Sequence, residues 1–157
     1  MNPIYSFTVP VFEKSLNALD ALLGKIQTQM ADKQIDEVML METRLAPDMF
    51  PFKKQVQVAC DNAKGSVACL EGIEIPSHPD TETTIDELRA RIKKVLDFIA
   101  TPSEHDFEAA SERRITLPYF PGKYMTGFDY AREYAIPNFL FHVVTAYAIL
   151  RMKGFEI

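Results

Sequence analysis

Apolar residues recur along the first part of the chain with the spacing of one helix face. From Phe12 the intervals are 4, 3, 4, 3 and 4 residues, through Leu16, Leu19, Leu23, Ile26 and Met30. Intervals of three and four place side chains in one stripe of an α-helix, as in a long bundle helix. Proline is favoured in the first turn of a helix, so we expect this helix to begin near Pro10 and to fade at Asp32.

Two further stripes predict two more long helices. The second helix begins around Pro51 and stops at Gly72, with apolar positions Phe52, Val56, Ala59, Ala63, Val67 and Leu70. The third carries apolar positions at Ile85, Leu88, Ile92, Val95 and Ile99. Thr84 and Glu87 form a T-x-x-E capping box at its start, and Glu87 and Arg91 are spaced for an ion pair on the solvent side.

The segment after the third helix does not follow the helical spacing. In residues 103–127, the stretches ITLPY and KYMTG flank a Pro121-Gly122 turn and predict a small hairpin. Residues 128–153 predict a last helix that Pro137 must kink or restart and that Gly154 closes. With a short helix at Asp36–Met41, the pattern predicts an all-α four-helix bundle, as one domain of residues 1–157, with a small β-hairpin before the last helix.

Composition and charge narrow the classes of partner. The chain has 157 residues, 47% of them hydrophobic, and a net charge of −5 with dispersed basic residues, which argues against binding nucleic acid or an anionic membrane. The N-terminus lacks the features of a signal peptide, and the uncharged stretch 134–150 falls short of a membrane span. Cys60 and Cys69 lie too far apart on one helix to pair, so free thiols favour a cytoplasmic location.

Candidate chemistry centres on the last helix. Motifs for nucleotide binding, hydrolase nucleophiles and zinc binding are absent. Asn138, His142 and Thr145 form a polar stripe on an otherwise apolar helix, and such groups need hydrogen-bond partners when buried. The stripe is either one wall of a ligand pocket or a set of satisfied core residues, and the second arrangement is the more common one.

The second helix supplies the candidate partners of this stripe. Asp61 lies midway along that helix, where it can face His142 across the bundle, and Gln55 and Gln57 lie on neighbouring stripes. No histidine or carboxylate stands three or four residues from His142, so its own helix offers no second metal ligand.

Three stretches, RLAPDMFPFKKQVQVACDNAKG, DTETTIDELRARI and YAIPNFLFHVVTAYAILRMKG, resemble a bacterial family of unknown function within the DinB/YfiT-like superfamily. The resemblance covers nearly the whole chain and implies a four-helix bundle with up-down-down-up topology, commonly a homodimer. It also implies metalloenzymes, some of them thiol-dependent S-transferases, with one histidine on the second helix and an H-x-x-x-H pair on the fourth. His142 matches one histidine of that pair. Asn138 or Ala146 occupies the partner position, and the second helix offers only Gln55 or Gln57.

Two hypotheses of function follow. The first is a dimeric small-ligand-binding scaffold that lacks the complete three-histidine site, with no cofactor, and with a pocket lined in part by Asn138, His142 and Thr145. The alternative is an enzyme with an altered site, of the metal-dependent hydrolase or thiol S-transferase type, in which His142 acts as base or ligand with the help of Asp61. If the other helices seal the last helix, a second copy is expected to cover the aromatic residues Phe120, Tyr124, Phe128 and Tyr130.

Overall fold

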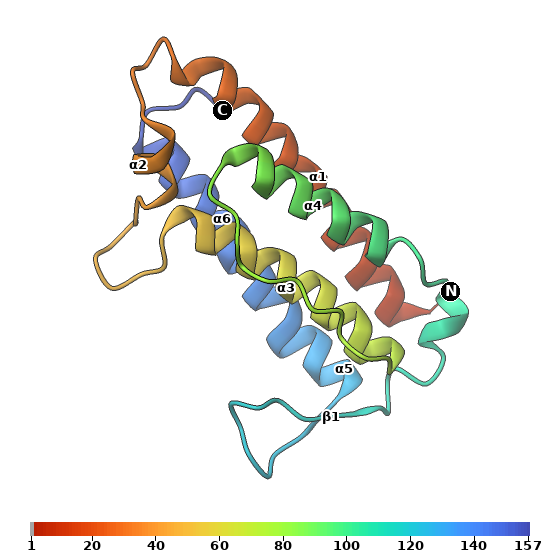
Figure 1. Cartoon of the computed structure of the whole chain (residues 1–157). Coiled ribbons are helices and arrows are strands. Elements are labelled where there is room, and N and C mark those ends of the chain that lie inside the picture. The colour runs from red at the N-terminus through yellow and green to blue at the C-terminus, as the bar shows by residue number, and fades with distance from the viewer. Residues whose placement is uncertain (1) are drawn as a thin grey trace.

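The computed structural model describes residues 2–157 and confirms the helical bundle with a small hairpin (Figure 1). The long helices are α1 (Pro3–Met30), α3 (Phe52–Glu71), α4 (Ile85–Ile99) and α6 (Ile136–Met152), and the short α2 (Glu37–Met41) joins the first two. Helices α1 and α6 run in one direction and α3 and α4 in the other, which is the expected up-down-down-up order (Figure 1). Helix α3 packs on both α4 and α6, so it forms the centre of the bundle.

The core consists of the apolar stripes that the sequence predicts. The stripe residues of α1 from Phe12 to Ile26 are at most 1% exposed, and those of α3 and α4 are fully buried. Phe12 and Phe139 meet edge to face with ring centroids 4.8 Å apart, which ties α1 to α6.

Helix α1 begins at Pro3, so the prediction of a start near Pro10 was wrong. The side chain of Asn2 accepts hydrogen bonds from the backbone N–H groups of Ile4 and Tyr5, which caps the helix seven residues earlier. Pro10 is exposed inside the helix, where it removes one backbone hydrogen bond without a steric conflict in the core.

Residues 73–84, which we call the strap, run back along the bundle from the end of α3 to the start of α4 (Figure 1). Helix α3 ends at Gly72, whose φ of 83° is accessible to glycine and whose N–H bonds to the carbonyl of Ala68 at 2.8 Å. The capping box of Thr84 and Glu87 opens α4 as expected.

The hairpin consists of two short strands, β1 (Arg114–Ile115) and β2 (Met125–Thr126). They pair antiparallel, with Ile115 opposite Met125. A 3₁₀ turn, η1 (Glu104–Phe107), precedes them and buries Phe107, an element that the sequence pattern did not reveal.

The last helix has three parts, because Pro137 cannot continue an ordinary helix. After α5 (Gly127–Asp129), residues Tyr130–Ala135 (η2) form a π-helical turn, in which the N–H of Ile136 bonds to the carbonyl of Ala131 five residues back. The wider turn relieves the conflict between the proline ring and the preceding turn. Pro137 lies in the first turn of α6, directly after the π-helical turn, so the helix restarts there, which is one of the two predicted alternatives.

One face of α6 remains uncovered. The exposed residues of this face are Leu140, Phe141, Val144 and Tyr147. Residues Gly127–Met152 are long and apolar enough to span a membrane by length and composition, a test that core helices of soluble proteins also pass. The condition that the other helices seal this helix is therefore not met on its outer face.

Candidate functional site

His142 and Gln55 meet between α6 and α3. The Nδ1 atom of His142 lies 2.6 Å from Oε1 of Gln55, and Nε2 of Gln55 donates to the backbone carbonyl of Phe50 at 3.0 Å. Because the amide nitrogen of Gln55 is committed to that carbonyl, its oxygen accepts from the Nδ1–H of His142. This hydrogen bond leaves Nε2 of His142 as the unprotonated ring nitrogen.

The imidazole of His142 is packed rather than open. The residue is 7% exposed, with the ring of Phe50 stacked beside it at 6.5 Å and that of Phe141 edge-on at 5.0 Å between centroids. Burial lowers the pKa of His142 and so favours the neutral ring. The geometry is that of a hydrogen-bonded core histidine.

The other predicted site residues separate into different environments. Thr145 donates to a carbonyl of its own helix at 2.7 Å. Asn138 donates to Oδ1 of Asn62 at 3.4 Å, and Gln57 donates to Glu82 of the strap at 2.9 Å. The structure therefore brings Gln55 to His142 but directs Gln57 away from it.

Asp61 belongs to a cluster of charges around Arg91 rather than to His142. The guanidinium of Arg91, 2% exposed, lies 2.9 Å from Asp61, 3.0 Å from Asp80 and 3.1 Å from Glu82. The prediction of a solvent-side pair between Arg91 and Glu87 was therefore wrong, because Glu87 is used in the helix cap. Arg91 instead fastens the strap to α3 and α4.

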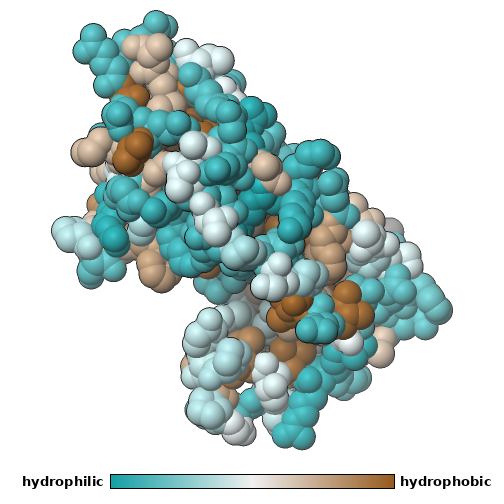
Figure 2. Space-filling view, in the orientation of Figure 1, coloured by the Kyte–Doolittle hydropathy of each residue, from teal (hydrophilic) through white to brown (hydrophobic). Residues whose placement is uncertain are grey.

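A cleft of about 500 Å³ opens beside this cluster. Its walls are α3, the first half of the strap, residues 117–119 and the π-helical turn, and its polar lining includes Asp61, Lys64, Ser66, His78, Tyr130 and Tyr134. Figure 2 shows the surface hollowed between the bundle and the hairpin segment, with apolar atoms beside the hollow. A volume of this size suits a small molecule.

In the cleft wall, the ammonium of Lys64 has the greatest need of hydrogen-bond acceptors. Its side chain is 5% exposed, and Nζ has one acceptor, Oδ1 of Asp61 at 3.0 Å, among the described residues. An ammonium carries three N–H groups, and a buried donor without a partner is costly. The cleft therefore offers buried donor capacity that a water or a ligand must satisfy.

Two tyrosines also line the cleft. The hydroxyl of Tyr130 lies 3.3 Å from Oγ of Ser66, and both residues are buried. The ring of Tyr134 stacks on that of Tyr130 at 5.7 Å and 23°. Both tyrosines belong to the π-helical turn, so the turn that Pro137 imposes also shapes this wall.

The nucleophilic side chains near the cleft are not activated. Burial raises the pKa of Cys60 to about 12, and burial also raises the pKa of Cys69 and of Tyr130. A thiol or phenol with a raised pKa is protonated at neutral pH and therefore a weak nucleophile.

The side chains present do not fit the three-histidine metal site that the resemblance implies. Within residues 2–157, no group of three or more histidine, cysteine, aspartate or glutamate side chains is placed to hold a metal ion. His78 lies on the strap, and His105 bonds to Glu108 on the surface at 2.8 Å.

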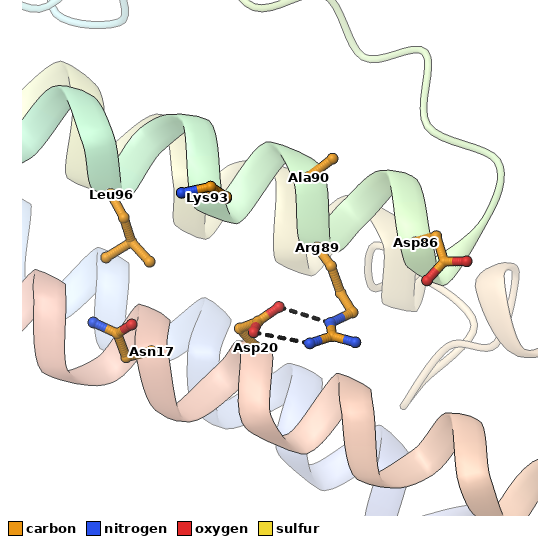
Figure 3. Close-up of a pocket in the computed structure, with 7 residues that line it drawn as sticks. All are labelled: Asn17, Asp20, Asp86, Arg89, Ala90, Lys93 and Leu96. Carbon is orange, nitrogen blue, oxygen red and sulfur yellow. Dashed lines mark hydrogen bonds and ion pairs between the residues drawn. The ribbon is translucent and has the colours of Figure 1, made fainter.

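A second hollow, between α1 and α4, differs from the cleft in its bonding (Figure 3). Arg89 binds both carboxylate oxygens of Asp20, at 2.8 and 3.1 Å, and donates to Gln27 at 3.2 Å. These side chains satisfy one another's hydrogen bonds. They therefore join α1 to α4 and leave few donors or acceptors for a ligand.

The sequence pattern did not indicate that one site contains Lys64, Ser66, Tyr130 and Tyr134. Only Asp61 among the predicted site residues lines the cleft directly, and Asn138 contacts it through Asn62. Pro137 was the available signal, because a proline inside an apolar helix predicts a local distortion, and π-type distortions often accompany functional sites.

Comparison with known proteins places the chain in a family. None of the curated proteins gives a significant match. The structure matches the crystal structure of a DinB family member protein from Shewanella denitrificans with a TM-score of 0.93 and 45% identity, over 98% of this chain and 87% of that one. Residues 4–157 match the family described as Domain of unknown function (DUF1993). The chain therefore belongs to the DUF1993 family and has a DinB-like helical fold.

Proposed function

We propose that the protein is a small-ligand-binding bundle, active as a homodimer, and that the cleft beside Lys64 is its binding site. The observation that carries the proposal is the buried ammonium of Lys64, which has a single acceptor within residues 2–157 and lines a cleft of about 500 Å³. The raised pKa values of Cys60 and Cys69 favour binding over covalent catalysis. The same free thiols support a cytoplasmic location.

A thermal-shift screen of small metabolites tests the proposal. A compound at about 100 times its Kd stabilises the folded state by roughly 2.7 kcal/mol, which raises the melting temperature by several degrees. We expect Lys64→Met to lose the shift. Lys93→Met is the matched control, because Lys93 is 77% exposed on α4, and it should keep the shift.

The outcome that contradicts this site is also clear. A compound that stabilises the wild type and Lys64→Met equally binds elsewhere in the molecule. If its shift is instead lost in His142→Ala, the ligand depends on the packed histidine rather than on the cleft.

The dimer is supported by the uncovered face of α6. Phe141 is 53% exposed and Val144 60%, next to Leu140 and Tyr147 on the same face. A second copy placed against this face would bury these side chains. Tyr130, one of the aromatics expected at the interface, is 4% exposed in the chain and fills the cleft wall instead.

Sedimentation equilibrium tests the dimer. We expect self-association of the wild type at micromolar concentration and a monomer for Val144→Glu, with Lys93→Glu on α4 as the control. A strictly monomeric wild type contradicts the dimer while leaving the cleft untouched.

A second candidate is an enzyme with an altered site of the metal-dependent hydrolase or thiol S-transferase type. One observation favours it: the bond to Gln55 leaves Nε2 of His142 unprotonated, the form that binds metals or accepts protons. Elemental analysis of protein purified without chelators tests it. A near-stoichiometric metal that disappears in His142→Ala favours the enzyme, and no metal in either protein leaves the binding scaffold.

A further inference from the structure

The hydrogen bonds of Lys64 indicate what kind of group the cleft accepts. Oδ1 of Asp61 receives both Nζ of Lys64 at 3.0 Å and the guanidinium of Arg91 at 2.9 Å. One carboxylate oxygen is thus shared between two buried cations, and Lys64 keeps N–H groups that have no acceptor in the part of the chain that the structure describes. A ligand that supplies an acceptor, above all a charged one, satisfies them best.

The charges around the strap also favour a ligand that supplies a charged acceptor. Asp80 and Glu82 are engaged by Arg91, and Asp80 also pairs with Lys54, so these carboxylates do not neutralise Lys64. Burial, followed by Lys64, Lys94 and Arg91, lowers the pKa of His78 in the cleft wall, and Asp61 opposes them. Burial is the main cause of this lowered pKa, and among the charges the three cations outweigh Asp61 at His78, which is compatible with an anion beside Lys64.

The remaining walls favour a flat apolar body. Tyr134 stacks on Tyr130 and lines the cleft, and Leu117, Pro118 and Ile75 complete this side. Aromatic rings gain from stacking or edge contacts with other rings beyond the apolar area that they bury. The cleft thus combines the ammonium of Lys64, paired on one side with Asp61, with an aromatic and aliphatic wall.

We infer that the cleft binds a small aromatic carboxylate, whose carboxylate group accepts from Lys64 and whose ring lies against Tyr134. This inference rests on the proposed function and names its ligand class. The carboxylate would supply the acceptor that Lys64 lacks, and the ring would displace water from the wall formed by residues 117–119 and the π-helical turn.

A panel of four probes tests the inference by calorimetric titration of the full chain. Benzoate has both features, benzamide lacks the charge, benzylamine reverses it, and cyclohexanecarboxylate lacks the flat ring. We expect benzoate to bind about tenfold more tightly than benzamide and cyclohexanecarboxylate, and benzylamine not to bind.

Two variants test separately the preference for a carboxylate and the preference for an aromatic ring. Lys64→Met should bind benzoate no better than benzamide, and Asp61 keeps its partner Arg91 in this variant. Tyr134→Leu, at a partly exposed position, should bind benzoate no better than cyclohexanecarboxylate. Lys93→Met should behave as the wild type.

The possible failures are distinct. Benzylamine binding as tightly as benzoate, a preference for benzoate that survives Lys64→Met, or binding of none of the four probes overturns the inference. The proposed function still stands if a compound of other chemistry from the screen binds and loses affinity in Lys64→Met. The proposed function is contradicted together with the inference if the binding of no compound depends on Lys64.

Discussion

Replacing Arg91 with methionine removes the cation that fastens the strap to the bundle. The side chain of Arg91 is 2% exposed, and its ion-pair partners Asp61, Asp80 and Glu82 have side chains 38%, 34% and 12% exposed. Methionine retains much of the side-chain volume, so the change tests the charge and its hydrogen bonds more than the packing.

The expected loss is about 3 kcal/mol of unfolding free energy. Removing one partner of a buried ion pair costs roughly 3–5 kcal/mol, because the other charge remains without compensation. Two of the carboxylates are partly exposed and regain water, which places the loss at the lower end of that range. For a chain of this size, the melting temperature should fall by roughly 6–12 °C.

Urea unfolding followed by circular dichroism measures the loss, and Arg89→Met is the matched control on the same helix. Arg89 also pairs with a carboxylate (Figure 3). Its side chain is 37% exposed, however, and that of Asp20 is 33% exposed. We expect Arg89→Met to cost less than about 1 kcal/mol. Equal losses in the two variants, or a loss below about 1 kcal/mol for Arg91→Met, would refute the assignment of Arg91 as the fastening residue.

Three further predictions follow from local geometry. Burial lowers the pKa of His142 in the folded state below the ordinary histidine value of about 6.5. The contribution of the neutral ring to stability is therefore fully present above about pH 6.5 and is lost as the pH falls below that value. In urea unfolding, His142→Asn should show a smaller loss of stability than the wild type between pH 7.5 and 5.5. Gly72→Ala should lose more stability than Gly122→Ala, because both have positive φ but the new Cβ at Gly72 also displaces the guanidinium of Arg113, whose Nε donates to the carbonyl of Leu70 at 3.1 Å; equal losses would contradict this. Gln55→Leu should destabilise the fold by about 1–3 kcal/mol, because it leaves the N–H of His142 without an acceptor, and an unchanged midpoint of denaturation would show that the bond contributes nothing.

The fold was largely predictable because its helices follow simple spacing. The stripes from Phe12 to Ile26 in α1 and from Ile85 to Ile99 in α4 could be located from intervals of three and four, and each proved to be buried. The start of α1 was less predictable than the starts of α3 and α4. Pro10 marks the start of the visible stripe, whereas the helix itself begins where Asn2 caps it.

The site was less predictable because it depends on contacts between distant segments. His142 drew attention as a polar residue in an apolar helix, and the structure gives it Gln55, 87 residues away, as partner. Lys64 and Ser66 lie on a helix whose polar positions resemble an ordinary solvated face. Their burial follows from the path of the strap and from the π-helical turn that brings Tyr130 to Ser66, and helical spacing encodes neither.

The measurement that tests the central claim most directly is the NMR footprint of a ligand found in the thermal-shift screen. We expect the backbone amide signals to shift in residues 61–69 of α3, in residues 75–78 of the strap and around Tyr134, while those beside Gln55 and His142 stay in place. Shifts centred on Gln55 and His142, with those of residues 61–69 unchanged, would show that the binding site is the histidine pair and not the cleft beside Lys64.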